Sequence, residues 1–351
     1  MKILQFKIIM ITILFGTLNA QTIYVDINKG KDKNEGTKEF PVCTIEKAAE
    51  LVNNNNSKMS GNIKVEPGVY NLTTKIVFNN DKFIEQERLI IQADVLPDDT
   101  SWSPEKMPVI MSTSGSSENF GFDCSLGFDI EVSHVTIRGL KFLGNPNPDV
   151  YYYYPIGRSG KNLTDLEVAQ CIFVGEKDAM PVQSGILTHG NQIKVTHCVF
   201  YNCRNSVVFY FANEDRNIER YGSEMSYCIV YGSYESGIWT ASPDKDFKFF
   251  NNVITNCKYA WVHNIDNKTN YRIENCIITN NENYITSLDG KVWEFSPSDI
   301  NYSEKNVIKE GVIVLQKKTE DGFVMPKDYL HIVKGNLGDN LNSGIFLINR
   351  N

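Results

Sequence analysis

After its first twenty residues, the chain lacks any hydrophobic run long enough to cross a membrane as a helix. It also lacks a pair of cysteines with C-x-x-C spacing, which disfavours a zinc site. Positive charge is not in excess, because 35 Lys and Arg stand against 42 Asp and Glu, a formal net charge of −7. An acidic surface is a poor partner for nucleic acid. We therefore predict no membrane span, no nucleic-acid partner and no cysteine-ligated metal.

The first twenty residues have the composition of a signal peptide. Lys2 and Lys7 form a basic start, residues 8–15 form an apolar run, and residues 18–20 resemble a cleavage site. Loss of the two lysines would change the formal net charge from −7 to −9. We expect cleavage near Ala20 and a secreted or periplasmic protein. Residues 21–351 contain no linker rich in Pro, Ser or Gly, so we predict one domain and a monomer.

Six segments share one pattern of apolar and polar positions. They are VTIRGLKF (135–142), LEVAQCIF (166–173), IKVTHCVF (193–200), SEMSYCIV (223–230), FKFFNNVI (247–254) and YRIENCII (271–278). The pattern alternates with period 2, which indicates strands. Its recurrence every 24–31 residues indicates a repeat architecture. Parallel strands cannot be joined by tight hairpins, so each unit should form one turn of a parallel β-helix.

A second strand is predicted in each repeat. The segments are GILTH (185–189), VVFYF (207–211), GIWTA (237–241), AWVHN (260–264) and YITSL (284–288). Alternation places Ile186, Val207, Ile238, Trp261 and Ile285 in one inward column, and Thr188, Phe209, Thr240, His263 and Ser287 in the next. We therefore expect His263 to be a hydrogen-bonded core histidine. The repeated segments also carry an outward column, Glu167, Lys194, Glu224 and Lys248, whose alternating charges favour surface ion pairs.

This pattern resembles the pectin-lyase-like right-handed parallel β-helix proteins, in which Asn or Cys often stacks at a corner of the coil. Residues 22–52 are similar to the N-terminal segment of secreted members, with Thr44 as N-cap and helical spacing of Ile45, Ala48, Ala49 and Val52. The predicted fold class is all-β, a right-handed parallel β-helix with a short N-terminal capping helix. The resemblance implies a secreted, bacterial, carbohydrate-active protein.

The boundaries within the predicted domain follow from the same pattern. We expect a capping segment at about residues 21–60, regular rungs at about 130–290 and a closing segment at about 291–351. GVIVL (311–315) should be one more rung strand, and residues 328–348 should cover the far end of the coil.

Eight cysteines in an exported protein would suggest disulfides. Here Cys171, Cys198, Cys228 and Cys276 share one inward column, and Cys203 and Cys257 share another. Side chains that point the same way from adjacent parallel strands do not readily reach disulfide geometry. We predict buried thiols for these six and leave the state of Cys43 and Cys124 open.

The candidate site comes from loops that enter at one phase of the coil, after the second strand. These loops are residues 144–162, 212–222, 241–246 and 265–269. The predicted floor consists of two outward rows: Leu187, Val208, Trp239, Val262 and Thr286, and then His189, Tyr210, Ala241, Asn264 and Leu288. Trp239 and the loop residues Tyr152, Tyr153 and Arg158 are predicted to bind substrate, since aromatic rings suit sugar faces. The competing interpretation is that these rings only pack loops onto the coil.

Two chemistries fit the predicted site. Hydrolysis needs two carboxyl groups, which Asp215 with Asp244 or Asp246 would supply. Elimination from a uronic acid needs a base, His189 or Tyr210, and a cation, Arg216, Arg220 or Ca²⁺ held by loop carboxylates. The motifs of polygalacturonases and pectate lyases are missing, apart from a partial echo in THGNQIK (188–194), which lowers the case for either activity. We expect a polysaccharide-binding or polysaccharide-degrading protein; the alternative is a non-catalytic surface, adhesion or matrix protein.

Overall fold

The structure is a computed structural model. It describes residues 21–55, 61–209, 220–241, 244–264, 271–289, 294–297, 302–317 and 326–347. The predicted signal peptide, Tyr210, Asp215 and Arg216 lie outside the described residues.

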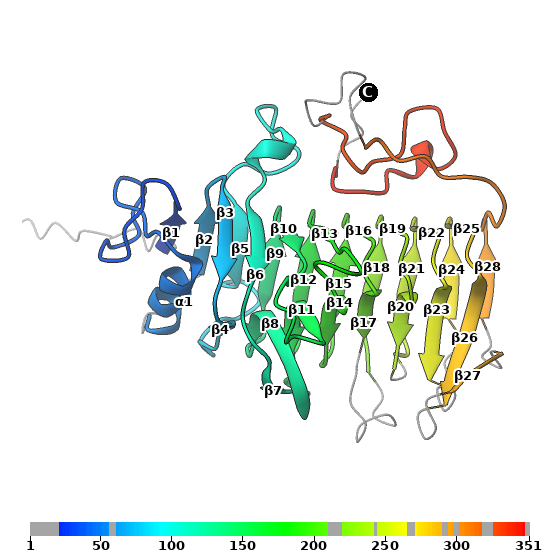
Figure 1. Cartoon of the computed structure of the whole chain (residues 1–351), viewed down its shortest axis with the longest axis horizontal. Coiled ribbons are helices and arrows are strands. Elements are labelled where there is room, and N and C mark those ends of the chain that lie inside the picture. Colours follow the sequence, from blue (N-terminus) through cyan, green and yellow to red (C-terminus); the bar gives the residue numbers. More distant parts are fainter. Residues whose placement is uncertain are drawn as a thin grey trace, which may run out of the picture.

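The described chain winds through three parallel sheets, one strand of each per turn (Figure 1). Sheet A contains β1 (Gln21–Val25), β2 (Gly61–Val65), β5 (Leu89–Ala93), β9 (Val135–Arg138), β12 (Leu166–Ala169), β15 (Ile193–Thr196), β18 (Glu224–Ser226), β21 (Lys248–Phe250), β24 (Tyr271–Glu274) and β28 (Tyr302–Lys305). Sheet B contains β3 (Val69–Leu72), β6 (Val109–Ser112), β10 (Lys141–Leu143), β13 (Ile172–Val174), β16 (Val199–Tyr201), β19 (Ile229–Tyr231), β22 (Val253–Thr255) and β25 (Ile277–Thr279).

Sheet C is the third face of the coil. Its strands are β4 (Ile76–Phe78), β8 (Phe122–Ile130), β11 (Tyr153–Arg158), β14 (Ser184–Thr188), β17 (Asn205–Phe209), β20 (Ser236–Thr240), β23 (Tyr259–Asn264), β26 (Asn283–Asp289) and the antiparallel β27 (Glu294–Pro297). A short strand, β7 (Ser117–Asn119), forms an antiparallel hairpin with the start of β8. The predicted right-handed parallel β-helix is confirmed.

The predicted register is confirmed strand by strand. Val168 pairs with Ile137 and Val195 in sheet A, and Phe173 pairs with Phe142 and Phe200 in sheet B. The phenylalanine rings stack at 5.0 and 4.7 Å between centroids. The corner between these sheets needs a left-handed residue, and Gln170, His197, Tyr227, Asn251 and Asn275 adopt φ of 50–54° there. Each turn of the coil therefore repeats the same backbone path.

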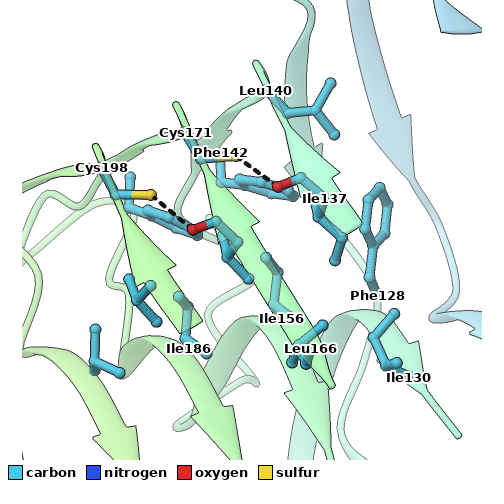
Figure 2. Packing of buried hydrophobic residues seen from close by; sticks show 14 of the residues in the cluster. Phe128, Ile130, Ile137, Leu140, Phe142, Ile156, Leu166, Cys171, Ile186 and Cys198 are labelled. Atoms are coloured by element: carbon cyan, nitrogen blue, oxygen red, sulfur yellow. Dashed lines mark hydrogen bonds between the residues drawn. The ribbon is translucent and has the colours of Figure 1, made fainter. Parts of the chain in front are cut away.

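The internal column of thiols is also confirmed, because all eight cysteines are free. Cys171 Sγ donates to the Ile137 carbonyl at 3.8 Å, and Cys198 Sγ donates to the Val168 carbonyl at 3.5 Å (Figure 2). Each thiol thus contacts the preceding turn of the coil. Cys124, whose state was open, is buried as well, whereas Cys43 is partly exposed. Burial raises the pKa of the Cys203, Cys257 and Cys276 thiols to about 12.

Helix α1 (Ile45–Asn53) begins as predicted. The Thr44 hydroxyl accepts a hydrogen bond from the Lys47 backbone N–H at 3.1 Å, and the helix buries Ile45, Ala48, Ala49 and Val52. The helix contacts β1, β2 and β4 at the first turns of the coil (Figure 1). Its apolar face therefore covers the open N-terminal end of the core.

The C-terminal segment differs from the prediction. Residues 311–317 do not form a rung strand; Leu315 makes one antiparallel bridge to Ile332. Residues 326–347 do not cover the far end of the coil but run back over the outer face of sheet B (Figure 1). Ile313, Leu315, Leu330, Ile332 and Ile345 pack there on the outward apolar row of that sheet. We call residues 311–317 and 326–347 the C-terminal strap.

Candidate functional site

A cavity of about 720 Å³ lies on the outer face of sheet C. Its floor is the outward row of Leu187, Val208 and Trp239, which occupies three successive turns in β14, β17 and β20. Leu187 and Val208 are buried, and Trp239 is partly exposed. Of the predicted floor rows, Leu187, Val208, Trp239 and His189 line the cavity, whereas Val262, Thr286, Ala241, Asn264 and Leu288 do not.

An aromatic wall stands at one side of this floor. Phe120 and Phe122, at the turn of the β7–β8 hairpin, extend over β11, where Phe122 meets Tyr152 at 6.0 Å and Tyr154 at 6.3 Å between ring centroids. Phe120 meets the His189 ring edge-on at 5.3 Å. The wall therefore crosses sheet C from Tyr152, just before β11, to His189, just after β14. The hairpin lies outside the sequence repeat, so the repeat gave no signal for it.

His189 lines the cavity and is 4% exposed. Its Nδ1 lies 3.0 Å from the Ser159 carbonyl oxygen. A carbonyl oxygen can only accept, so this contact places the proton of a neutral His189 on Nδ1 and the lone pair on Nε2. A histidine held in this tautomer can act as a base through Nε2, but Nε2 is buried here, so a ligand in the cavity reaches it only after a local movement of the groups that cover it.

A polar group lies at the opposite edge of the cavity. Arg204 pairs through Nε with Glu235 Oε2 and donates from Nη1 to the Gln183 amide oxygen at 3.1 Å. Burial lowers the pKa of Arg204, but the charge and the hydrogen bond of Glu235, together with Tyr151, raise it by more in total, so the pKa lies above its ordinary value. Arg204 and Glu235 directly precede the paired residues Asn205 and Ser236. That register was a signal for this pair which the sequence interpretation missed.

Of the residues predicted to bind substrate, Tyr152 and Trp239 line the cavity and the other two do not. Tyr153 belongs to β11, so its assignment to a loop after the second strand was wrong. Its side chain is 1% exposed and does not reach the cavity. Arg158 is fully buried at the end of β11 and donates to the carbonyls of His189 at 3.0 Å and Asn191 at 3.3 Å. Arg158 therefore fixes the chain that carries His189.

The predicted catalytic groups that the structure describes on later loops do not line the cavity. Arg220 is 5% exposed and donates to the Lys161 carbonyl at 3.1 Å. Asp244 is 1% exposed and accepts from the backbone N–H groups of Ser223 and Asp246, both at 3.1 Å. Asp246 is exposed, away from the lining residues. Asp244 has the contacts of a turn-forming residue, which does not fit the predicted catalytic acid.

The prediction for His263 is confirmed. It is 2% exposed inside the coil, its Nε2 lies 3.1 Å from the Ser287 hydroxyl, and its Nδ1 lies 2.8 Å from the Asn264 carbonyl. Among the described residues, no cluster of three or more His, Cys, Asp or Glu could hold a metal ion. Calcium held by loop carboxylates stays a prediction, since Asp215 lies outside those residues. No helix in the described part of the chain is long and apolar enough to span a membrane.

Comparison with known proteins supports the architecture. Residues 130–300 match the family model described as "Right handed beta helix region". This protein is a right-handed parallel β-helix protein. The matched region and the three parallel sheets agree with the right-handed parallel β-helix that the resemblance implies. A search of curated proteins found no significant match to this β-helix protein.

Several solved structures resemble the β-helix protein at low sequence identity. A GH136 lacto-N-biosidase from Eubacterium ramulus has a TM-score of 0.47 and 11% identity, covering 83% of this chain and 68% of its own. A rhamnogalacturonan lyase has a TM-score of 0.46 and 12% identity, covering 93% and 100%. The complex of XylC with xylose has a TM-score of 0.45 and 10% identity, covering 84% and 70%. Likeness at this level indicates neither the substrate nor the reaction of this chain.

Proposed function

We propose that this β-helix protein binds carbohydrate in the cavity of sheet C. The observation that carries the proposal is the combination of aromatic rings at Trp239, Tyr152 and Phe122 with polar groups at both edges. Sugar rings present apolar C–H faces that stack on such surfaces, while hydroxyl groups need the donors and acceptors at the rim. The volume of about 720 Å³ falls within the range of small-ligand pockets.

The binding proposal is tested with a panel of plant and algal polysaccharides and their oligosaccharides, by affinity gel electrophoresis and calorimetry. Trp239→Ala should weaken binding at least about tenfold, since the floor would lose its only partly exposed indole. Tyr302→Ala is the matched control, because Tyr302 is an exposed aromatic residue on β28 that does not line the cavity. If the wild-type protein binds no carbohydrate in the panel, the proposal is wrong and the non-catalytic adhesion alternative is favoured.

We further propose that a reaction in this cavity would be elimination from a uronic acid rather than hydrolysis. Among the described lining residues, Glu235 is the one carboxylate, and Arg204 already engages it. Hydrolysis needs two carboxyl groups across the bond. His189, in contrast, has the tautomer of a base, and Lys161 is a cation among the lining residues.

The proposed step is written for a uronate in the cavity. After a local movement exposes it, His189 Nε2, which is buried in this structure, takes the proton from the carbon next to the carboxylate. A carbon–carbon double bond forms, and the glycosidic C–O bond to the leaving sugar breaks. The leaving oxygen takes a proton from solvent, and Lys161 offsets the charge that develops on the carboxylate. The test follows the ultraviolet absorbance of the unsaturated product on pectic and alginate substrates. Loss of this signal in His189→Ala supports the proposal; new reducing ends without unsaturation would contradict it.

Export is part of the proposed function, since an extracellular polysaccharide is reached only outside the cell. The support is the basic start, apolar run and cleavage-like residues of the first twenty positions. Mass spectrometry of the protein expressed with its leader in a bacterial host should find a mature chain that begins at about Gln21 in the exported fraction. A full-length chain retained in the cytoplasm would contradict this.

A further inference from the structure

The aromatic wall stands across one end of the cavity of sheet C along the axis of the coil. A solenoid usually offers a long open surface, along which an extended chain can lie across many turns. Here the rings of Phe120, Phe122 and Tyr154 stand over the turns of β8 and β11, with centroid separations of 6.3–6.4 Å. A polymer lying along the coil axis would meet these rings end-on.

The wall is anchored to the coil by polar contacts. The Lys75 ammonium donates to Asn119 Oδ1 and to Asp129 Oδ2, both at 2.7 Å, and so joins the hairpin to sheet C. Asn119 also donates to the Cys124 carbonyl at 3.0 Å within the hairpin. Phe120 lies directly over Gly157, where a Cβ atom would approach its ring to 3.2 Å. The Phe120 ring packs closely against the backbone of Gly157, which fixes its position.

The floor of the cavity is short. It runs from Leu187 through Val208 to Trp239, three neighbouring strands, which at about 4.8 Å per strand gives roughly 10 Å. The next residues of the same row, Val262 and Thr286, are 0% and 6% exposed and do not line the cavity. Beyond them, Phe295 of β27 stacks on Tyr259 at 4.6 Å. The lining residues that the structure describes thus stop at Trp239.

We infer that the site receives the end of a carbohydrate chain or a free short oligosaccharide, not the interior of a polymer. The inference rests on the proposed function and specifies the part of the substrate that is recognised. The wall supplies a stop for the terminal sugar ring, and the Arg204–Glu235 pair supplies donors and acceptors at one edge for its hydroxyl groups.

The test measures affinity against chain length. Galacturonan, xylan and cellulose oligomers from dimer to hexamer, and the parent polymers, are titrated into the wild-type protein by calorimetry, with concentrations expressed per chain end. The Kd should level off at a short oligomer and change by less than about tenfold between the hexamer and the polymer. The inference would be overturned if the Kd per chain end fell by well over tenfold as the chain lengthened, or if it depended on the number of internal units. Carbohydrate binding itself would remain supported in both cases. Absence of binding to every probe would instead remove the proposed function itself.

A variant sharpens the same test. Phe120→Ala with Phe122→Ala opens the wall, so affinity should now rise with chain length, as expected for a groove. Phe40→Ala is the matched control, because Phe40 is a 64% exposed phenylalanine in the N-terminal segment, remote from the hairpin in the fold. If the double variant folds and keeps the wild-type length profile, the wall is not the stop. The wild-type length series decides the inference on its own if the double variant does not fold.

Discussion

Sheets B and C are built from the same repeat, yet their outer faces end in different environments. Both present an apolar outward row: Ile172, Val199, Ile229, Val253 and Ile277 on sheet B, and Leu187, Val208 and Trp239 on sheet C. The C-terminal strap, together with Trp102 and Met107, packs over the row on sheet B, whereas the row on sheet C lines a cavity. An apolar face left in water is unfavourable, so it marks either intramolecular packing or a binding surface.

Hydrogen bonds and an aromatic contact hold the strap on sheet B. No described segment is held over the face of sheet C in the same way. Asp98 accepts from the Leu347 backbone N–H at 3.1 Å and from Gln170 Nε2 at 2.8 Å, and Gln170 also donates to the Ile345 carbonyl at 2.9 Å. Phe346 packs edge-on against Trp102 at 5.4 Å between centroids. This chain therefore covers the apolar face of sheet B with its own strap, while the face of sheet C lines a cavity.

The largest expected effect separates the two faces by a matched charge. Ile229→Asp places an unpaired carboxylate beneath the strap, at a position that is fully buried, and should lower the free energy of unfolding by about 3–5 kcal/mol. Val208 is 4% exposed, but it lines the cavity, into which an aspartate side chain can extend toward solvent. Val208→Asp should therefore cost less stability than Ile229→Asp while abolishing carbohydrate binding. Urea unfolding monitored by circular dichroism measures both. Equal destabilisation at the two sites would break the comparison.

The second prediction compares two tryptophans on adjacent turns of sheet C. Trp261 points inward, donates to Thr240 Oγ1 at 2.9 Å and is 2% exposed, so Trp261→Ala should cost about 3–5 kcal/mol of stability. Trp239 points outward into the cavity, so Trp239→Ala should leave most of the stability and remove binding. Thermal unfolding and titration with the oligosaccharide found in the panel check the pair. A large loss of stability in Trp239→Ala would mean that this ring is core and not site.

The third prediction concerns the thiol column shared by both faces. Burial raises the pKa of Cys257 from its ordinary value of 9.0 to about 12. The thiol ionises at lower pH in the unfolded chain than in the folded protein, so ionisation above pH 9 favours unfolding. The contribution of Cys257 to the free energy of unfolding is therefore fully present below pH 9 and is lost as the pH rises from 9 toward 12. Near pH 10 the loss is about 1 kcal/mol for this thiol. Cys257→Ala should therefore show a pH dependence between about pH 8 and 10 that is weaker than wild type by about that amount, measured by urea unfolding at each pH. Parallel pH profiles for the two proteins would contradict this prediction.

The smallest expected effect is on sheet A, the solvated face. Lys194 lies 3.5 Å from Glu167 on the neighbouring strand, within the predicted charged column. The pair is partly exposed, so Lys194→Ala should change the free energy of unfolding by less than about 1 kcal/mol and leave binding unchanged. A loss comparable to that of Ile229→Asp would show that this face, too, depends on specific contacts.

The coil was predictable from the repeat, because each turn carries the same alternation of inward and outward residues. Period 2 assigned inward and outward positions, and vertical stacking of Phe142, Phe173 and Phe200 then fixed the register. The same rule identified the floor residue Trp239 and the core residue His263 correctly. It failed for Tyr153, because residues 144–162 contain a strand of sheet C that the pattern did not mark as one.

The cavity and the strap depend on segments outside the repeat. The β7–β8 hairpin and the C-terminal strap carry no periodic signal, and their positions follow from contacts between residues far apart in the chain, such as Phe120 with His189 or Asp98 with Leu347. The coil, its register and its buried thiols follow from the amino-acid sequence, since strand alternation and stacking are local and repeated. Which apolar face is covered and which holds a cavity depends on where the non-repeated segments fold back onto the coil, and this is seen only in the folded structure.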